Sequence, residues 1–123
     1  MKKIFLVDDD SIHLSIAAIM LQEKYDITTI KSGREALMEI INGNIPDLIL
    51  LDIVMPGMDG WELYSQLKDI TVLRDVPIAF FTSSEEKADM EYAKKLGAAD
   101  YIKKPCDGAD LLRRVGAMLR RVA

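Results

Sequence analysis

Short apolar runs alternate along this chain with longer stretches in which apolar residues recur every three or four positions. The short runs are rich in β-branched and aromatic residues, as strands are, and the longer stretches have the period of amphipathic helices. Five such pairs follow one another, with no repeat or low-complexity segment between them. The pattern predicts an α/β fold built from strand–helix units around a parallel sheet. The expected strands cover residues 4–7, 27–30, 48–51, 78–81 and 101–102.

Residues that commonly cap helices precede the helical stretches. Ser32 with Glu35, and Ser83 with Glu86, have the spacing of a capping box, in which both side chains bind backbone amides at the start of a helix. Aspartates are expected to cap the first, third and last helices. They are Asp10, Asp59 and Asp107.

Apolar residues that recur at helical spacing indicate where the helices lie along the chain. The first helix is expected over about residues 11–24, the second ends near Ile41, the fourth stops at Gly97, and the last continues to the end of the chain. In the fourth and last helices the apolar spacing predicts the face that packs on the core. The spaced residues are Ile12, Ile16, Ile19 and Met20 in the first helix, Trp61, Leu63 and Leu67 in the third, Met90, Ala93 and Leu96 in the fourth, and Leu111, Val115 and Met118 in the last.

Length and composition indicate one soluble globular domain over residues 1–123. No apolar run is long enough to span a bilayer, so we expect a cytoplasmic protein without membrane insertion. One cysteine, Cys106, excludes an intramolecular disulfide, and a small buried hydrophobic role is expected for it rather than redox sensing. The formal net charge of −4 argues against direct nucleic-acid binding by this domain.

Four of the expected strands end at residues that can handle a phosphoryl group or a metal. Asp8 and Asp9 follow the first strand, Asp52 the third, and Thr82 the fourth, while Lys104 lies just beyond the fifth. Because the carboxyl ends of parallel strands share one edge of a sheet, we expect these side chains to meet at one site. Three carboxylates and one ammonium group leave two negative charges, which a divalent cation would cancel.

The chemistry of this cluster suits phosphoryl transfer to an aspartate. Mg²⁺ prefers oxygen ligands and is held in many proteins by one or two carboxylates. An aspartate can attack phosphorus when a cation and hydrogen-bond donors neutralise the transferring group. Lys104 and Thr82 are the candidate donors. The pair Asp8 and Asp9 alone would fit a solvated helix cap equally well, but four occupied strand ends favour a functional site.

Across the whole chain, these residues resemble the receiver domain of bacterial two-component response regulators. The matching segments have the family's order and approximate spacing, and they cover residues 7–9, 52–60, 81–83 and 101–105. The resemblance implies a flavodoxin-like, doubly wound five-stranded parallel sheet in the order 2-1-3-4-5, with helices on both faces. It also implies a phosphoacceptor switch that catalyses only its own phosphorylation and dephosphorylation and is not a metabolic enzyme.

The resemblance further implies roles for individual residues. Asp52 would accept a phosphoryl group from a histidine kinase or a histidine phosphotransfer protein. Mg²⁺ would be bound by Asp8, Asp9, Asp52 and the backbone carbonyl of Val54, and the phosphoryl oxygens would contact Thr82 and Lys104.

The family's switch couples the threonine to an aromatic residue of the fifth strand, which corresponds here to Thr82 and Tyr101. Phosphorylation would then change the binding of a downstream protein or output domain at the face formed by the fourth helix, fifth strand and fifth helix.

Neighbouring residues receive simpler interpretations. Lys103 and Lys104 alternate faces if the strand continues, and the family pattern of lysine before proline selects Lys104. The resemblance also implies a cis peptide before Pro105. His13, the single histidine, is read as a surface or packing residue, although its place beside the acidic pair could bring it to a phosphodonor helix.

Two positions that flank the expected path of a hydrolytic water carry short or apolar side chains. They are Val54, two residues after Asp52, and Ser84, two residues after Thr82. Because valine cannot orient water and serine is short, we expect a longer-lived aspartyl phosphate than in chemotaxis receivers.

Other functions fit the chain less well. A phosphatase of the haloacid-dehalogenase type needs a second carboxylate two residues after its nucleophile, where this chain has Val54. A pseudo-receiver that binds partners without phosphorylation would lack the acidic pair, the acceptor or the lysine, and all of them are present here. A flavin-binding flavodoxin is disfavoured because acidic residues follow the first strand. Both a single-domain regulator and a receiver joined to an output domain remain compatible with the sequence.

Overall fold

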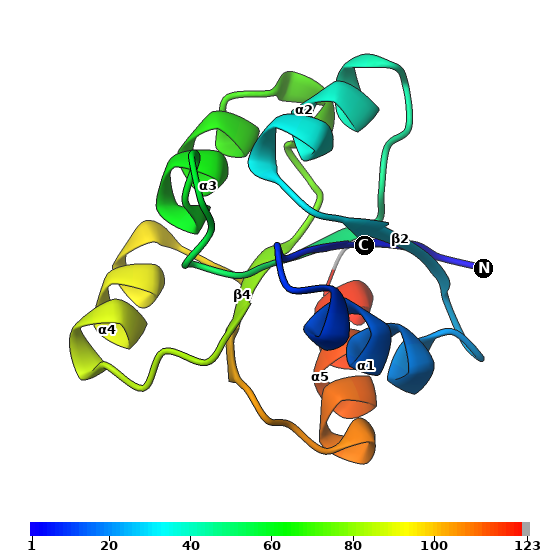
Figure 1. Cartoon of the computed structure of the whole chain (residues 1–123). Coiled ribbons are helices and arrows are strands. Elements are labelled where there is room, and N and C mark those ends of the chain that lie inside the picture. Colours follow the sequence, from blue (N-terminus) through cyan, green and yellow to red (C-terminus); the bar gives the residue numbers. More distant parts are fainter. Residues whose placement is uncertain (122–123) are drawn as a thin grey trace.

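The computed structural model describes residues 1–121 and contains a five-stranded parallel sheet with helices on both faces (Figure 1). The strands lie in the order β2-β1-β3-β4-β5, which confirms the predicted topology. They are β1 (Lys3–Val7), β2 (Asp26–Ile30), β3 (Leu48–Leu51), β4 (Ile78–Thr82) and β5 (Tyr101–Lys103). The helices are α1 (Ser11–Leu21), α2 (Gly33–Ile41), α3 (Gly60–Lys68), α4 (Lys87–Leu96) and α5 (Gly108–Arg120), with a short 3₁₀ helix, η1 (Thr71–Leu73), after α3.

The two faces of the sheet carry separate hydrophobic cores. Helices α2, α3 and α4 pack over one face, and α1 and α5 over the other (Figure 1). Along β1, Phe5 and Val7 enter the first core, whereas Ile4 and Leu6 enter the second. The central strands are therefore buried on both faces, which explains why the sequence shows continuous apolar runs instead of alternation.

The spacing of Ile12, Ile16 and Ile19 does not mark the buried face of α1. These side chains are 70%, 48% and 68% exposed, and the helix is buried instead through other apolar residues. The buried residues are Leu14, Ala17 and Leu21. Because α1 is apolar on most sides, its periodicity identified a helix without distinguishing its faces. The helix also ends at Leu21, three residues earlier than expected.

Most of the predicted helix caps are present. Ser32 accepts a hydrogen bond from the amide of Glu35 at 3.1 Å, and the three capping aspartates bind amides at the starts of α1, α3 and α5. The capping box of Ser83 and Glu86 is wrong, because α4 begins at Lys87 and its N-cap, Glu86, makes no side-chain hydrogen bond. The neighbouring Ser84 makes the contacts at this end of α4 instead.

The inner faces of the last two helices follow the predicted spacing only in part. Ala93 of α4 is buried, but Leu96 is 37% exposed because it lies at the end of the helix. In α5 the predicted residues are buried; they are Leu111, Val115 and Met118. The expected continuation of this helix to the chain end falls beyond Arg121, outside the described residues. Among residues 1–121, no helix is both long and apolar enough to cross a membrane.

Candidate functional site

The carboxyl edge of the sheet brings Asp8 and Asp52 together. Strands β1 and β3 pair in register, with Val7 opposite Leu51, so the next residue of each strand lies at the same edge. The amide of Asp52 donates to the carbonyl of Val7 at 2.9 Å. Asp8 and Asp52 are only 5% and 7% exposed. Two carboxylates are thus held close together in a largely water-free position, where an opposite charge interacts strongly with both.

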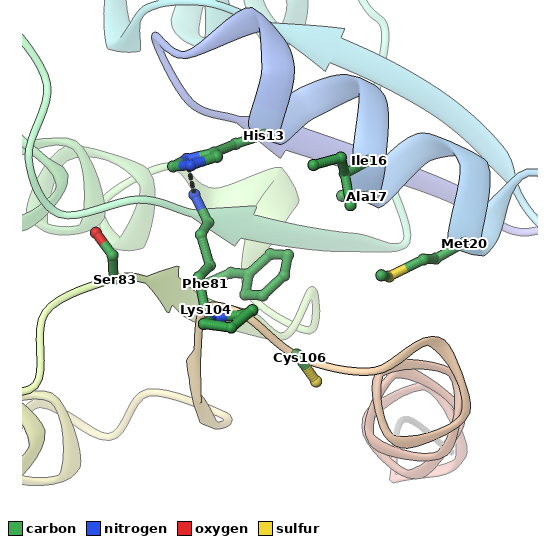
Figure 2. Close-up of a pocket in the computed structure, with 9 residues that line it drawn as sticks. His13, Ile16, Ala17, Met20, Phe81, Ser83, Lys104 and Cys106 are labelled. Atoms are coloured by element: carbon green, nitrogen blue, oxygen red, sulfur yellow. Dashed lines mark hydrogen bonds between the residues drawn. The ribbon is translucent and has the colours of Figure 1, made fainter.

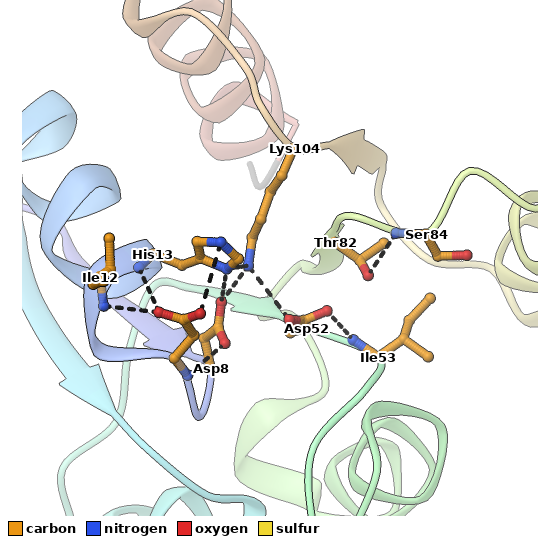
Figure 3. Close-up of polar contacts among 9 residues, drawn as sticks. Asp8, Ile12, His13, Asp52, Ile53, Thr82, Ser84 and Lys104 are labelled. Carbon is orange, nitrogen blue, oxygen red and sulfur yellow. Dashed lines mark hydrogen bonds and ion pairs between the residues drawn. The ribbon is translucent and has the colours of Figure 1, made fainter.

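Lys104 supplies that opposite charge. Its Nζ donates hydrogen bonds to Asp8 and, at 3.4 Å, to Oδ2 of Asp52 (Figure 3). The side chain of Lys104 is 10% exposed, whereas Lys103 is exposed. The structure therefore brings Lys104, and not Lys103, into the cluster. The Lys104–Pro105 peptide bond is cis, as the resemblance implied.

The second oxygen of Asp52 is also engaged. Its Oδ1 accepts a hydrogen bond from the amide of Ile53 at 2.7 Å. The amide of Gly60 donates to the carbonyl of Ile53 at 2.8 Å, so the first turn of α3 lies against the Asp52–Ile53 backbone. The Asp52 carboxylate is consequently oriented from both of its oxygens and supported by a helix start.

His13 contacts this cluster although its side chain is 38% exposed, so it lies partly at the surface, as expected, and also reaches the acidic pair. Its Nδ1 lies 3.5 Å from Oδ2 of Asp8 and 3.3 Å from Nζ of Lys104. The hydrogen bonds that Asp10 accepts from the amides of Ile12 and His13 start α1 at the site, so its first turn projects His13 over Asp8. The sequence signal that could have indicated this contact is the position of His13, three residues after the N-cap Asp10.

The main role of Asp10 is to cap the N-terminus of α1. The hydrogen bond from the His13 amide lowers the pKa of the Asp10 carboxyl below its ordinary value, with smaller contributions from the Ile12 amide and nearby positive groups. Within residues 1–121, Asp8, His13 and Asp52 each place a possible metal-ligating atom within 4.8 Å of the others. Asp9 lies on the same loop but is exposed and outside this group.

Thr82 and Tyr101 are joined through Ser84. Figure 3 shows Thr82 and Ser84 on the side of Asp52 opposite Asp8 and His13. Thr82 is fully buried, and its Oγ1 accepts a hydrogen bond from the amide of Ser84 at 3.3 Å. The hydroxyl of Tyr101 donates to the carbonyl of Ser84 at 3.1 Å. Burial raises the pKa of the Tyr101 phenol, which keeps it protonated as a donor. The two proposed switch residues therefore contact the same loop residue.

The two positions expected to flank a hydrolytic water differ in their surroundings. The side chain of Val54 is 72% exposed beside Asp52. The hydroxyl of Ser84 donates to Oδ2 of Asp89 at 2.6 Å. Val54 thus has no hydrogen-bonding side chain at its position, and the Ser84 hydroxyl is engaged with Asp89.

An apolar pocket of about 260 Å³ opens beside Lys104. Figure 2 shows Ile16 and Met20 of α1 on one side of it and Phe81 and Cys106 on the other. Cys106 is half-buried in this wall, so the expectation of a buried residue was only partly right. Burial and a hydrogen bond to Asp110 raise the pKa of its thiol, which lowers the reactive thiolate fraction and argues against redox sensing.

Comparison with known proteins identifies the class. A family model for the response regulator receiver domain matches residues 4–116, and the chain belongs to this family. The chain is 34% identical over 124 residues to the response regulator SaeR of Staphylococcus epidermidis, covering 100% of this chain and 52% of SaeR. It is 36% identical over 121 residues to PhoP of Bacillus subtilis, an alkaline phosphatase synthesis transcriptional regulatory protein, covering 98% of this chain and 49% of PhoP.

Solved structures agree with this assignment. The chemotaxis response regulator CheY4 of Vibrio cholerae superposes with a TM-score of 0.86 at 27% identity, covering 96% of this chain and 98% of CheY4. A CheY-like receiver domain protein from Methanospirillum hungatei gives a TM-score of 0.87 at 27% identity, covering 98% of this chain and 95% of that one.

Membership of the receiver-domain family indicates the general role of the chain. The chain is a signalling domain of the two-component type, a family that generally binds Mg²⁺ and works with histidine kinases and output domains. It spans about half the length of SaeR and PhoP, so the activities of those whole proteins do not transfer to it.

Proposed function

We propose that residues 1–123 form a phosphoacceptor switch in which Asp52 receives a phosphoryl group from the phosphohistidine of a histidine kinase or phosphotransfer protein. The observation that carries this proposal is the buried Asp52 carboxylate at the end of β3, held by Lys104 and the Ile53 amide. A carboxylate oxygen attacks phosphorus, the new O–P bond forms, and the P–N bond breaks with its electron pair leaving on the imidazole nitrogen. The products are an aspartyl phosphate and a free histidine.

The donor set fits Mg²⁺, because two buried carboxylates share one ammonium group and retain a net negative charge. Asp8, Asp9 and Asp52, with the backbone carbonyl of Val54, would hold the ion. When bound, Mg²⁺ neutralises charge on the transferring phosphoryl group.

Lys104 and Thr82 would stabilise the phosphoryl oxygens from the protein side. The Lys104 ammonium already lies within hydrogen-bonding distance of Asp52, so a short movement would bring it to a group attached there. The Thr82 hydroxyl is buried at the end of the adjacent strand and can donate a hydrogen bond after rotation about its side chain.

The exposed apolar residues of α1 support docking of the phosphodonor next to the acceptor. Ile12, Ile16 and Ile19 are exposed on the helix that also carries His13 into the cluster, and the pocket lined by Ile16 adjoins Lys104. A helix of the donor could bury this apolar surface while presenting its phosphohistidine at Asp52. The proposed function also keeps the expected cytoplasmic location, where the domain would meet its phosphodonor.

The downstream face would be formed by α4, β5 and α5. Arg114 of α5 contacts both oxygens of Asp100 at 3.0 Å and binds Asp110 through Nε at 3.0 Å. These contacts tie α5 to the start of β5, so these two elements of the face can respond together when Tyr101 moves. Phosphorylation would shift its population toward a form that binds a downstream protein or output domain, without direct nucleic-acid binding by this domain.

The test is intact-mass measurement after incubation with acetyl phosphate and Mg²⁺. We expect one added phosphate on the wild type and none on Asp52→Asn. Asp75→Asn is a matched control, because Asp75 is a highly exposed acid away from the sheet edge, and it should label like the wild type. An unlabelled wild type, or a fully labelled Asp52→Asn, would contradict the proposed function.

A further inference from the structure

We propose that Ser84 is the positioning residue that connects the two switch residues to α4, through the hydrogen bond between its hydroxyl and Asp89. This inference rests on the proposed function, and it assigns a side-chain role to a residue that the sequence suggested only as a flank of the water path.

The backbone of Ser84 is held by both switch residues. Its amide donates to Oγ1 of Thr82 at 3.3 Å, and its carbonyl accepts from the hydroxyl of Tyr101 at 3.1 Å. Figure 3 shows the Thr82–Ser84 contact beside the acceptor. A change in the hydrogen bonding of either side chain therefore acts directly on the position of Ser84.

The side chain of Ser84 is held by α4. Its Oγ donates a hydrogen bond at 2.6 Å to Oδ2 of Asp89, which lies in the first turn of the helix. The same Oγ accepts a hydrogen bond from the amide of Glu86 at 3.4 Å. A hydrogen bond to an ionised carboxylate is stronger than one between neutral groups. Ser84 thus makes polar contacts with Thr82, Tyr101 and the start of α4 at the same time.

Among the five α-helices that the structure describes, α4 alone has no hydrogen bond from its N-cap side chain. Helices α1, α2, α3 and α5 each begin with an aspartate or serine whose side chain binds a helix amide. The N-cap of α4, Glu86, makes no such bond. The first amides of a helix have no partner within it, so the position of an uncapped start is weakly determined. The Ser84 hydroxyl supplies the missing polar attachment from outside the helix.

This arrangement gives a physical path from the acceptor to α4. If Thr82 turns its hydroxyl toward a phosphoryl oxygen, the Ser84 amide loses its acceptor and the loop shifts. Because the Ser84 hydroxyl is bound to Asp89, the first turn of α4 shifts with it. An alanine at position 84 would keep the backbone contacts with Thr82 and Tyr101 but break the link to α4.

The experiment compares Ser84→Ala with Ser84→Thr, which keeps a hydroxyl, and with Ser83→Ala, the same change at the neighbouring exposed serine. Asp89→Ala and the double variant Ser84→Ala/Asp89→Ala complete a double-mutant cycle. Two quantities are measured before and after treatment with acetyl phosphate and Mg²⁺. They are the mass of the protein and the amide hydrogen exchange of residues 87–92.

Trp61 offers a second readout of α4. Its ring lies 4.8 Å from that of Tyr92, in an edge-on arrangement that joins α3 to α4. Movement of α4 should therefore change Trp61 fluorescence, and the change on phosphorylation can be compared between variants without assigning individual amides.

We expect Ser84→Ala to take up phosphate like the wild type but to lose at least half of the phosphorylation-dependent change in α4 exchange and Trp61 fluorescence. Before phosphorylation, its α4 amides should exchange about fivefold faster, as expected for one lost hydrogen bond. Ser84→Thr and Ser83→Ala should behave like the wild type, and the double variant should be no worse than either single variant.

Equal α4 exchange in Ser84→Ala and Ser83→Ala would overturn the proposal, as would additive effects of the Ser84 and Asp89 substitutions. An unlabelled wild type would contradict the proposed function instead, and the comparison of the unphosphorylated variants would still decide whether Ser84 positions α4.

Discussion

The first residue of α3, Gly60, lies directly against the backbone of Asp52. A Cβ atom at Gly60 would be 2.2 Å from the Asp52 carbonyl oxygen and 2.7 Å from the Cα of Ile53. A non-bonded carbon atom cannot approach a backbone oxygen so closely, so any larger residue would push α3 away from the acceptor. The position of Asp52 thus depends on the start of α3 as well as on β3.

We therefore expect Gly60→Ala to destabilise the domain by about 1–3 kcal/mol, the usual range for overpacking. Urea unfolding measures this change. Gly108→Ala is the matched control, because Gly108 also follows a capping aspartate at a helix start, and its Cβ would meet only Met20 at 3.6 Å. Equal losses of stability in the two variants would show that the contact with Asp52 is not the cause.

Lys104 and Lys103 should differ sharply in function. Lys104→Ala removes the ammonium that binds Asp8 and Asp52, so we expect labelling by acetyl phosphate to slow by about a hundredfold and the change in Trp61 fluorescence to be lost. Lys103→Ala should preserve both, because Lys103 is exposed. The reverse pattern would mean that the other lysine serves the site.

Mg²⁺ binding in the absence of phosphate should depend on Asp9 more than on Asp10. Asp9→Asn removes a negative ligand charge and should weaken binding by about tenfold or more in a titration followed by Trp61 fluorescence. Asp10→Asn should bind normally, because Asp10 caps α1 and asparagine caps a helix nearly as well. Equal weakening would show that the metal ligands are misassigned.

The aspartyl phosphate should decay slowly, because neither of the two side chains expected to flank the hydrolytic water is suited to orient it. Val54 is apolar, and the Ser84 hydroxyl is bound to Asp89. Val54→Asn should accelerate decay by about tenfold without changing Mg²⁺ affinity, since only the Val54 carbonyl is proposed to contact the ion. Val72→Asn, the same change at an exposed residue of η1, is the control. Decay of labelled protein after removal of the phosphodonor measures the rate, and an unchanged rate in Val54→Asn would exclude a limiting role for this position.

The sheet and the acidic cluster could be predicted because each depends on strong local signals. Strands buried on both faces give continuous apolar runs, and the residues that follow them must share one edge. Asp8, Asp52 and Lys104 meet there as expected. The order of the strands came from the resemblance to a family and not from periodicity, which does not report which strands are neighbours.

The features that could not be predicted depend on side-chain direction. The spacing of Ile12 and Ile16 fits a helix, but only tertiary packing shows that they face outward. Ser83 has the spacing of a cap, yet the loop after β4 brings Ser84 to α4 instead. The contact of His13 with Lys104 could not be predicted from spacing, because the two residues are far apart in the sequence.

The most direct measurement of the central claim locates the phosphoryl group on the chain. Sodium borohydride reduces an aspartyl phosphate to homoserine, so the protein is treated with acetyl phosphate and Mg²⁺, reduced, digested and mapped by mass spectrometry. We expect homoserine at position 52 alone, and none when acetyl phosphate is omitted. Homoserine at position 8 or 9 in place of 52, or its absence from every position, would contradict the assignment of Asp52 as the phosphoacceptor.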